Sequence, residues 1–85
     1  MRIILTAVFA SIAFSASASP QCTTEPEGKW LSEAVMRDKA VAAGNSIDVF
    51  KKTKGSCYEI YGRDAKGKRV EIYYHPVTGD IVETH

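Results

Sequence analysis

The sequence lacks the short motifs by which many catalytic and cofactor-binding sites are found. It contains no Gly-x-Ser-x-Gly, no His-Glu-x-x-His and no glycine-rich loop that could cradle a phosphate. Its two cysteines do not form a Cys-x-x-Cys pair. Its two histidines, His75 and His85, have no third ligand at metal-ligand spacing, and His85 is expected to be disordered. We therefore expect neither an enzyme nor a cofactor or metal site.

An excess of charge of either sign is also missing. Eleven Lys and Arg residues stand against ten Asp and Glu residues, and one of the basic residues, Arg2, lies at the N-terminus. Two basic clusters, at residues 51–54 and 66–69, are expected at opposite ends of the predicted sheet. The chain therefore has no whole-molecule field that would draw a nucleic acid or an anionic membrane.

Apolar residues form a continuous run only near the N-terminus. Residues 3–14 are apolar or small, a run shorter than the roughly 20 residues of a membrane span. The sequence Ala-Ser-Ala at residues 16–18 then matches the small-x-small pattern that precedes signal-peptide cleavage. We expect residues 1–18 to be a signal peptide cleaved after Ala18, with no membrane span, and the mature product to be periplasmic or secreted.

The remaining chain, residues 19–85, is one small domain whose core alone would be marginal. In an exported protein, an even number of cysteines indicates a disulfide, here Cys22 with Cys57. The long loop that it closes corresponds to about 4 kcal/mol of stabilisation in the chain-entropy model. Two free thiols are the alternative.

The first part of the mature chain predicts an arm followed by a helix. Residues 19–30 contain two prolines and a glycine and are expected to be irregular. Ser32 is a good N-cap, and Gly44 stops the helix, which we place at residues 33–43. Trp30 is expected to cap the core beside the helix start. The apolar stripe is expected to consist of Leu31, Ala34, Val35, Val41 and Ala42.

The rest of the chain predicts an antiparallel meander. Alternating residues at 46–52, at 57–61 and at 70–74 indicate three strands, and residues 81–83 indicate a short fourth. Glycine-containing turns separate them. The predicted fold class is α+β, with one N-terminal helix packed on a three- to four-stranded antiparallel meander. We expect one domain, residues 31–85, without repeats.

The aromatic residues divide between the two faces of this sheet. By parity, Tyr58 and Tyr74 belong to the core, whereas Tyr61 and Tyr73 share the opposite face with Glu59, Glu71 and Phe50. Cross-strand pairing alone can explain aromatic residues on a wet face. The alternative is a surface that binds a partner protein, since tyrosine and phenylalanine are common interface anchors. The candidate partner-binding face consists of Phe50, Tyr61 and Tyr73.

Three segments carry a family resemblance: YEIY at residues 58–61, GKRVEIY at 67–73 and PVTGDIV at 76–82. Together with the preceding helix and strand, they resemble the PepSY domain, and in particular its small exported members with a cysteine pair. The chain departs from the family pattern at His75, where the family usually carries aspartate before the proline. The resemblance implies a non-catalytic domain, found in propeptides of secreted metallopeptidases and in envelope proteins and proposed to modulate peptidases.

Three functions remain open at this point. The first is a monomeric exported binding module that docks to a peptidase and modulates or inhibits it, through the candidate face or through an exposed sheet edge. The second is a small metal- or ligand-binding periplasmic protein that uses His75 and nearby carboxylates. The third is a structural envelope factor without a discrete ligand.

Overall fold

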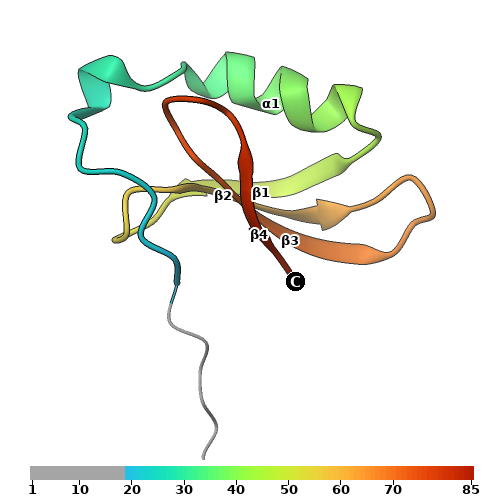
Figure 1. Ribbon diagram of the computed structural model, residues 1–85. Helices are drawn as coiled ribbons and strands as arrows, with labels where there is room; N and C mark the ends of the chain where they lie inside the picture. Colours follow the sequence, from blue (N-terminus) through green and yellow to red (C-terminus); the bar gives the residue numbers. More distant parts are fainter. Residues whose placement is uncertain (1–18) are drawn as a thin grey trace, which may run out of the picture.

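The computed structural model describes residues 19–85 (Figure 1), and the predicted signal peptide lies outside the described residues. An arm leads through a short 3₁₀ helix to the helix α1 and four strands, whose bounds are Glu27–Lys29, Glu33–Ala42 (α1), Ser46–Lys52 (β1), Tyr58–Arg63 (β2), Arg69–Tyr74 (β3) and Ile81–Thr84 (β4). The strands form one antiparallel sheet in the order β1-β2-β3-β4. The predicted α+β meander is confirmed.

Capping residues that can be recognised in the sequence determine where α1 begins and ends. The Ser32 hydroxyl accepts a hydrogen bond from the backbone N–H of Val35 at 3.2 Å, which satisfies one of the free amides of the first turn. At the other end, Gly44 adopts a φ of 94°, a left-handed conformation that a side chain would disfavour. The Gly44 and Asn45 amides then donate back to carbonyls of the last turn, those of Val41 and Ala40.

The buried stripe of α1 differs from the predicted one. Met36 and Ala40 are fully buried, whereas Val35 is 44% exposed and Val41 is 59% exposed. Each residue turns an α-helix by about 100°, so Met36 and Ala40 lie nearly in line, while Val35 and Val41 diverge from that line by about 120° on either side. Of the predicted stripe, only Leu31, which precedes the helix, packs against the core. The expectation for Ala34, Val35, Val41 and Ala42 was wrong.

The core lies between α1 and the sheet. Tyr58 and Ile60 of β2 and Ile72 and Tyr74 of β3 point toward the helix, as the alternation predicts. The Tyr58 hydroxyl donates a hydrogen bond to the Leu31 carbonyl at 2.7 Å. Partly buried apolar side chains close the rim of this core; they are Trp30, Leu31, Ile47, Phe50 and Val70.

A β-bulge in β1 moves Phe50 to the helix side of the sheet. Ile47 pairs with Gly62 and Val49 with Tyr61, so Asp48 is an extra residue without a partner. The parity of β1 therefore changes, and Phe50 faces α1 with its ring centroid 5.0 Å from that of Tyr58. The predicted position of Phe50 beside Tyr61 and Tyr73 was wrong, because simple alternation contains no bulge.

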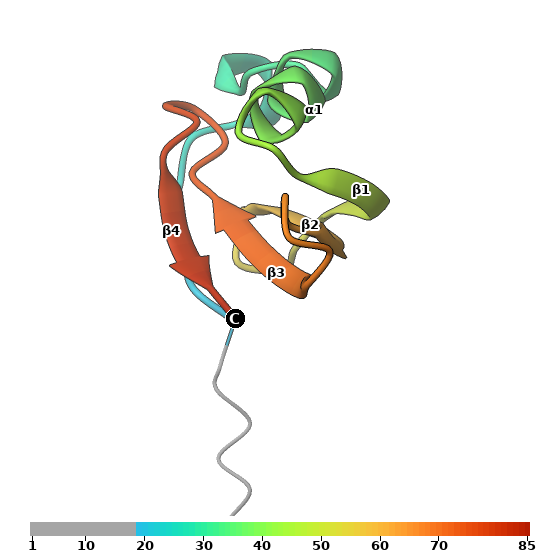
Figure 2. The ribbon, with the colours of Figure 1, turned by 90° about the vertical axis from the view of Figure 1, so that its right-hand side faces the viewer.

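The two faces of the sheet are covered by different parts of the chain. Figure 1 shows α1 lying across one face, while the N-terminal arm descends past the end of β1 and β2 to the opposite side. Figure 2, turned by 90°, also shows α1 on one side of the sheet and the start of the arm on the other. We call these the helix face and the second face. Among residues 19–85, no helix is long and apolar enough to cross a membrane.

A candidate binding site on the second face of the sheet

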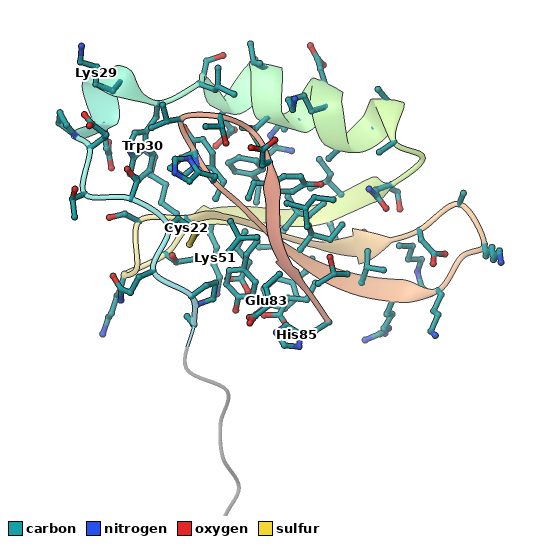
Figure 3. All side chains as sticks on the ribbon, in the orientation of Figure 1. Cys22, Lys29, Trp30, Lys51, Glu83 and His85 are labelled. Carbon is teal, nitrogen blue, oxygen red and sulfur yellow. A yellow bond between two sulfur atoms is a disulfide. The ribbon has the colours of Figure 1, made fainter. Side chains whose placement is uncertain are left out.

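Two cross-strand rows of side chains form the second face. The register of the strands places four residues side by side in each row. One row consists of Lys51, Glu59, Tyr73 and Glu83, and the other of Val49, Tyr61, Glu71 and His85. Figure 3 shows Lys51, Glu83 and His85 on the side of the sheet away from α1. Unlike the helix face, this surface concentrates carboxylates beside its tyrosines.

Glu59 is the most deeply buried charged residue on the second face. It is 2% exposed, and its Oε1 lies 3.3 Å from Lys51 Nζ. Its other oxygen, Oε2, is buried and has no hydrogen-bond partner among the described residues. A buried acceptor without a partner costs about 1–3 kcal/mol, and more when it is charged. The burial of Glu59 with one oxygen unpaired therefore lowers the stability of the fold.

Glu71 lies diagonally across from Glu59 and is bound more completely. The Tyr73 hydroxyl donates a hydrogen bond to Glu71 Oε1 at 2.7 Å. The neighbouring Glu59 carboxyl and then the hydrogen bond from Tyr73 hold the pKa of Glu71 below its usual range. Neighbouring carboxylates repel each other unless a proton or a cation offsets their charge. Glu59 and Glu71 thus concentrate negative charge in one part of the second face.

The two tyrosines of this face are tuned by the carboxylates. Glu59, as hydrogen-bond acceptor, raises the pKa of Tyr61 to about 12. Burial raises the pKa of Tyr73, and the hydrogen bond to Glu71 adds to the effect. Both phenols therefore keep their protons to a higher pH than a free tyrosine does, and Tyr73 donates a hydrogen bond to Glu71.

The N-terminal arm covers the middle of the second face. The Cys22 amide donates to the Gly55 carbonyl at 2.9 Å, and the carbonyl oxygen of Pro20 lies 3.2 Å from Cys57 Sγ. Gly55 permits this approach because a Cβ there would collide with the Pro20 carbonyl. Tyr73, on the same face, is only 6% exposed. Tyr73 is therefore buried, in contrast to its predicted place on a wet face.

A disulfide bond fastens the arm to the sheet. Cys22 and Cys57 are bonded, with their Cα atoms 5.1 Å apart and a separation of 35 positions in sequence. Their Cα separation is ordinary for a disulfide. The predicted Cys22–Cys57 pairing is confirmed in the structure, and it determines where residues 19–22 lie.

Of the three aromatic residues predicted to form one face, only Tyr61 is accessible. Its ring is 37% exposed, with Val49 opposite it on β1 and Lys51 Nζ 5.2 Å from its centroid. A pocket of about 160 Å³ adjoins it, lined by Asp48, Tyr61, Gly62, Arg69 and Val70. Sequence reasoning missed Val49, whose exposure depends on the bulge.

Comparison with protein families gives one match, and it spans almost the whole chain. The family model described as peptidase propeptide and YPEB domain matches residues 2–85. This chain belongs to the PepSY family. No curated protein and no solved structure matches it significantly. PepSY domains are in general non-catalytic, propeptide-like modules.

In the turn before β4, His75 takes the position at which the family pattern has aspartate. His75 Nδ1 accepts hydrogen bonds from the amides of Val77 and Thr78 at 3.2 and 3.3 Å. An aspartate oxygen makes the same kind of bond in an Asx-turn. The His75 amide also donates to the Asp80 carbonyl at 2.8 Å. The imidazole therefore serves as the acceptor that organises the turn.

The two histidines lie apart from any set of metal ligands in the described part of this PepSY domain. Within residues 19–85, no group of three His, Cys, Asp or Glu side chains is placed to hold a metal ion. His75 uses Nδ1 for the turn, and His85 Nε2 lies 2.9 Å from Glu83 Oε2. The expectation of a disordered His85 was wrong, because its amide and carbonyl both pair with Glu71.

Proposed function

We propose that this PepSY domain is a non-catalytic, exported binding module that docks to a peptidase of the compartment it enters and modulates its activity. The observation that carries the proposal is the family match over residues 2–85, because the family is described as a peptidase propeptide domain. The confirmed disulfide supports an oxidising, extracytoplasmic compartment.

The docking surface that we assign is the exposed end of the second face. Tyr61 and Val49 form a small apolar patch, 37% and 49% exposed respectively, beside the pocket lined by Asp48 and Arg69. An aromatic anchor next to a pocket is a common centre of a protein interface. Because β1 is an edge strand, a peptide segment of the peptidase can pair with it while its side chains contact Tyr61.

An affinity capture experiment tests both parts of the proposal. The oxidised domain, residues 19–85, is immobilised and exposed to an extract of its own compartment, and retained proteins are identified. We expect a peptidase to be retained by the wild-type domain. The Tyr61→Ala, Val49→Ser variant should lose it, because the anchor and its neighbour are removed.

Val41→Ser on α1 is the matched control. Val41 is as exposed as Val49 but lies on the helix, away from the second face, so this variant should retain the peptidase. The retained peptidase is then assayed with and without added domain, which measures inhibition or assistance directly. Retention of no peptidase by the wild-type domain would refute the function; equal retention by both variants would refute only the assigned surface.

A further inference from the structure

The second face holds one buried carboxylate oxygen for which residues 19–85 supply no hydrogen-bond partner. Glu83 Oε2 has His85 at 2.9 Å, Glu71 Oε1 has the Tyr73 hydroxyl at 2.7 Å, and Glu59 Oε1 has Lys51 at 3.3 Å. Glu59 Oε2 alone is buried and unpaired. Glu59 and Glu71 also lie in the same part of the second face. The negative charge there is therefore not fully balanced by the cations of the described residues.

The neighbouring lysines do not fill this position. Glu59 lines a pocket of about 260 Å³ together with Ser19, Thr53 and three lysines, Lys51, Lys52 and Lys54. Lys51 is already at the other oxygen of Glu59. Lys52 pairs with Glu27 at 3.0 Å, and Lys54 is exposed to solvent. Thr53 Oγ1 already accepts a hydrogen bond from the Cys57 amide at 3.0 Å, which leaves Ser19 as the remaining residue of the pocket lining.

Ser19 lies in the neighbourhood of Glu59 and Tyr73. It borders the Glu59 pocket, and a hydrogen bond from it lowers the pKa of Tyr73, opposing the larger rise caused by burial and by Glu71. Tyr73 in turn donates to Glu71. The disulfide at Cys22 and the packing of Pro20 on Gly55 hold Ser19 within a few residues of a fixed point. Its placement therefore survives the loss of the residues before it.

We propose that Glu59 binds the α-ammonium group of Ser19, which is created when the signal peptide is removed after Ala18. In the unprocessed chain the nitrogen of Ser19 is a neutral amide with a single N–H. Hydrolysis of the bond between Ala18 and Ser19 by water leaves a carboxylate on Ala18 and a primary amine on Ser19, which takes up a proton. The resulting ammonium has three N–H donors and the positive charge that the site lacks.

In this arrangement, the ion pair at Glu59 forms only after the signal peptide has been removed. Before cleavage, Glu59 Oε2 is buried beside a neutral amide; after cleavage, it faces a cation on a short tether. The groups that face the new ammonium are Glu59 and Lys51 from neighbouring strands and Glu71 and Tyr73 from β3, with Lys52 and Lys54 at the pocket rim. The mature N-terminus is thus an internal ligand of the second face. The proposal does not depend on docking to a peptidase.

The test compares three forms of the oxidised domain that differ only at the N-terminus. The first begins at Ser19 with a free amine, the second is acetylated on Ser19, and the third retains Ala18, which keeps the amine but moves it by about 3.8 Å along the chain. Urea unfolding at pH 6 should show a folding equilibrium constant about five- to tenfold higher for the first form than for the other two.

A second readout follows the amine itself. Nuclear magnetic resonance titration of the Ser19 form should give an α-amino pKa above the usual value of about 8, because Glu59 stabilises the charged form. Glu59→Gln should return that pKa to its usual value and should make the stabilities of the three forms equal. The comparison within this variant is valid even if the substitution lowers stability overall.

The mass of the exported protein shows whether it begins at Ser19. A different N-terminus in the exported protein would overturn the proposal. So would equal stability of the three forms together with an ordinary α-amino pKa. Retention of the full difference in Glu59→Gln would also contradict it, because the ammonium would then be bound elsewhere.

Discussion

The two faces of the sheet are stabilised in different ways although they belong to the same strands. On the helix face, apolar and aromatic side chains exclude water; the Tyr58 hydroxyl donates to a carbonyl, whereas the Tyr74 hydroxyl is buried without a partner among the described residues. On the second face, carboxylates and phenols bind one another beneath a covalently tethered arm. The helix face resists change through packing, whereas the second face depends on the arm and on pH.

The difference between the two faces also indicates which of them is accessible to a partner. The core side chains of the helix face are covered by α1, so they are not available to a partner. The second face is covered only in its middle, and its Val49 and Tyr61 end remains open. A small domain can in this way keep one face for its core and use the other for recognition and regulation.

Removal of the disulfide should have the largest effect. Cys22→Ala with Cys57→Ala frees the arm and removes a cross-link over 35 residues, so the free energy of unfolding should fall by about 4 kcal/mol in urea titrations. Wild-type protein whose disulfide has been reduced should show a similar fall in the free energy of unfolding. A loss below about 1 kcal/mol would mean that the arm contributes little to the second face.

Shortening a core side chain should have a slightly smaller effect, confined to the helix face. Met36 is fully buried, so Met36→Ala should cost about 3 kcal/mol through lost burial and the cavity that it leaves. Val41→Ala, on the exposed side of the same helix, should change the free energy of unfolding by less than about 0.5 kcal/mol. Equal losses in thermal or urea unfolding would contradict the burial of this helix.

The smallest effect is expected from alkaline titration of the tyrosines. An unfolded tyrosine loses its proton near pH 10, whereas Tyr61 in the fold keeps it to about pH 12. Stability from this group is therefore complete below pH 10 and declines as the pH rises toward 12. Phenolate absorbance, assigned with Tyr61→Phe, measures the titration.

Glu59→Gln provides the control for that titration. Because Glu59 is the leading cause of the raised pKa of Tyr61, this substitution should bring it back toward 10. The pKa of Tyr58 and Tyr74 on the helix face, raised chiefly by burial, should not change. A wild-type Tyr61 that titrates near pH 10 would contradict the hydrogen bond with Glu59.

Local patterns in the sequence predicted most of the fold. Ser32 and Gly44 mark the ends of α1 because capping depends on neighbouring residues. Alternation predicted the strands and the burial of Tyr58 and Tyr74, since side chains on a strand have a period of two. The pairing of Cys22 with Cys57 followed from their number and the predicted export.

The candidate site was predicted less well, for two physical reasons. A bulge inserts one residue without leaving a pattern in the sequence, so Phe50 was placed on the wrong face and Val49 was overlooked. Burial also depends on segments distant in the sequence, and the arm that covers Tyr73 is brought there by a bond between residues 35 positions apart.

The sequence by itself determined the secondary structure, the membership of the PepSY family and the cross-link, because each depends on local periodicity, on caps or on a pair of residues. Only the tertiary structure decided which side chains share the second face, that Glu59 is buried with one oxygen unpaired, and that Ser19 lines the same pocket. Those facts arise from strand register and from the path of a tethered arm, which are set by packing across the whole domain.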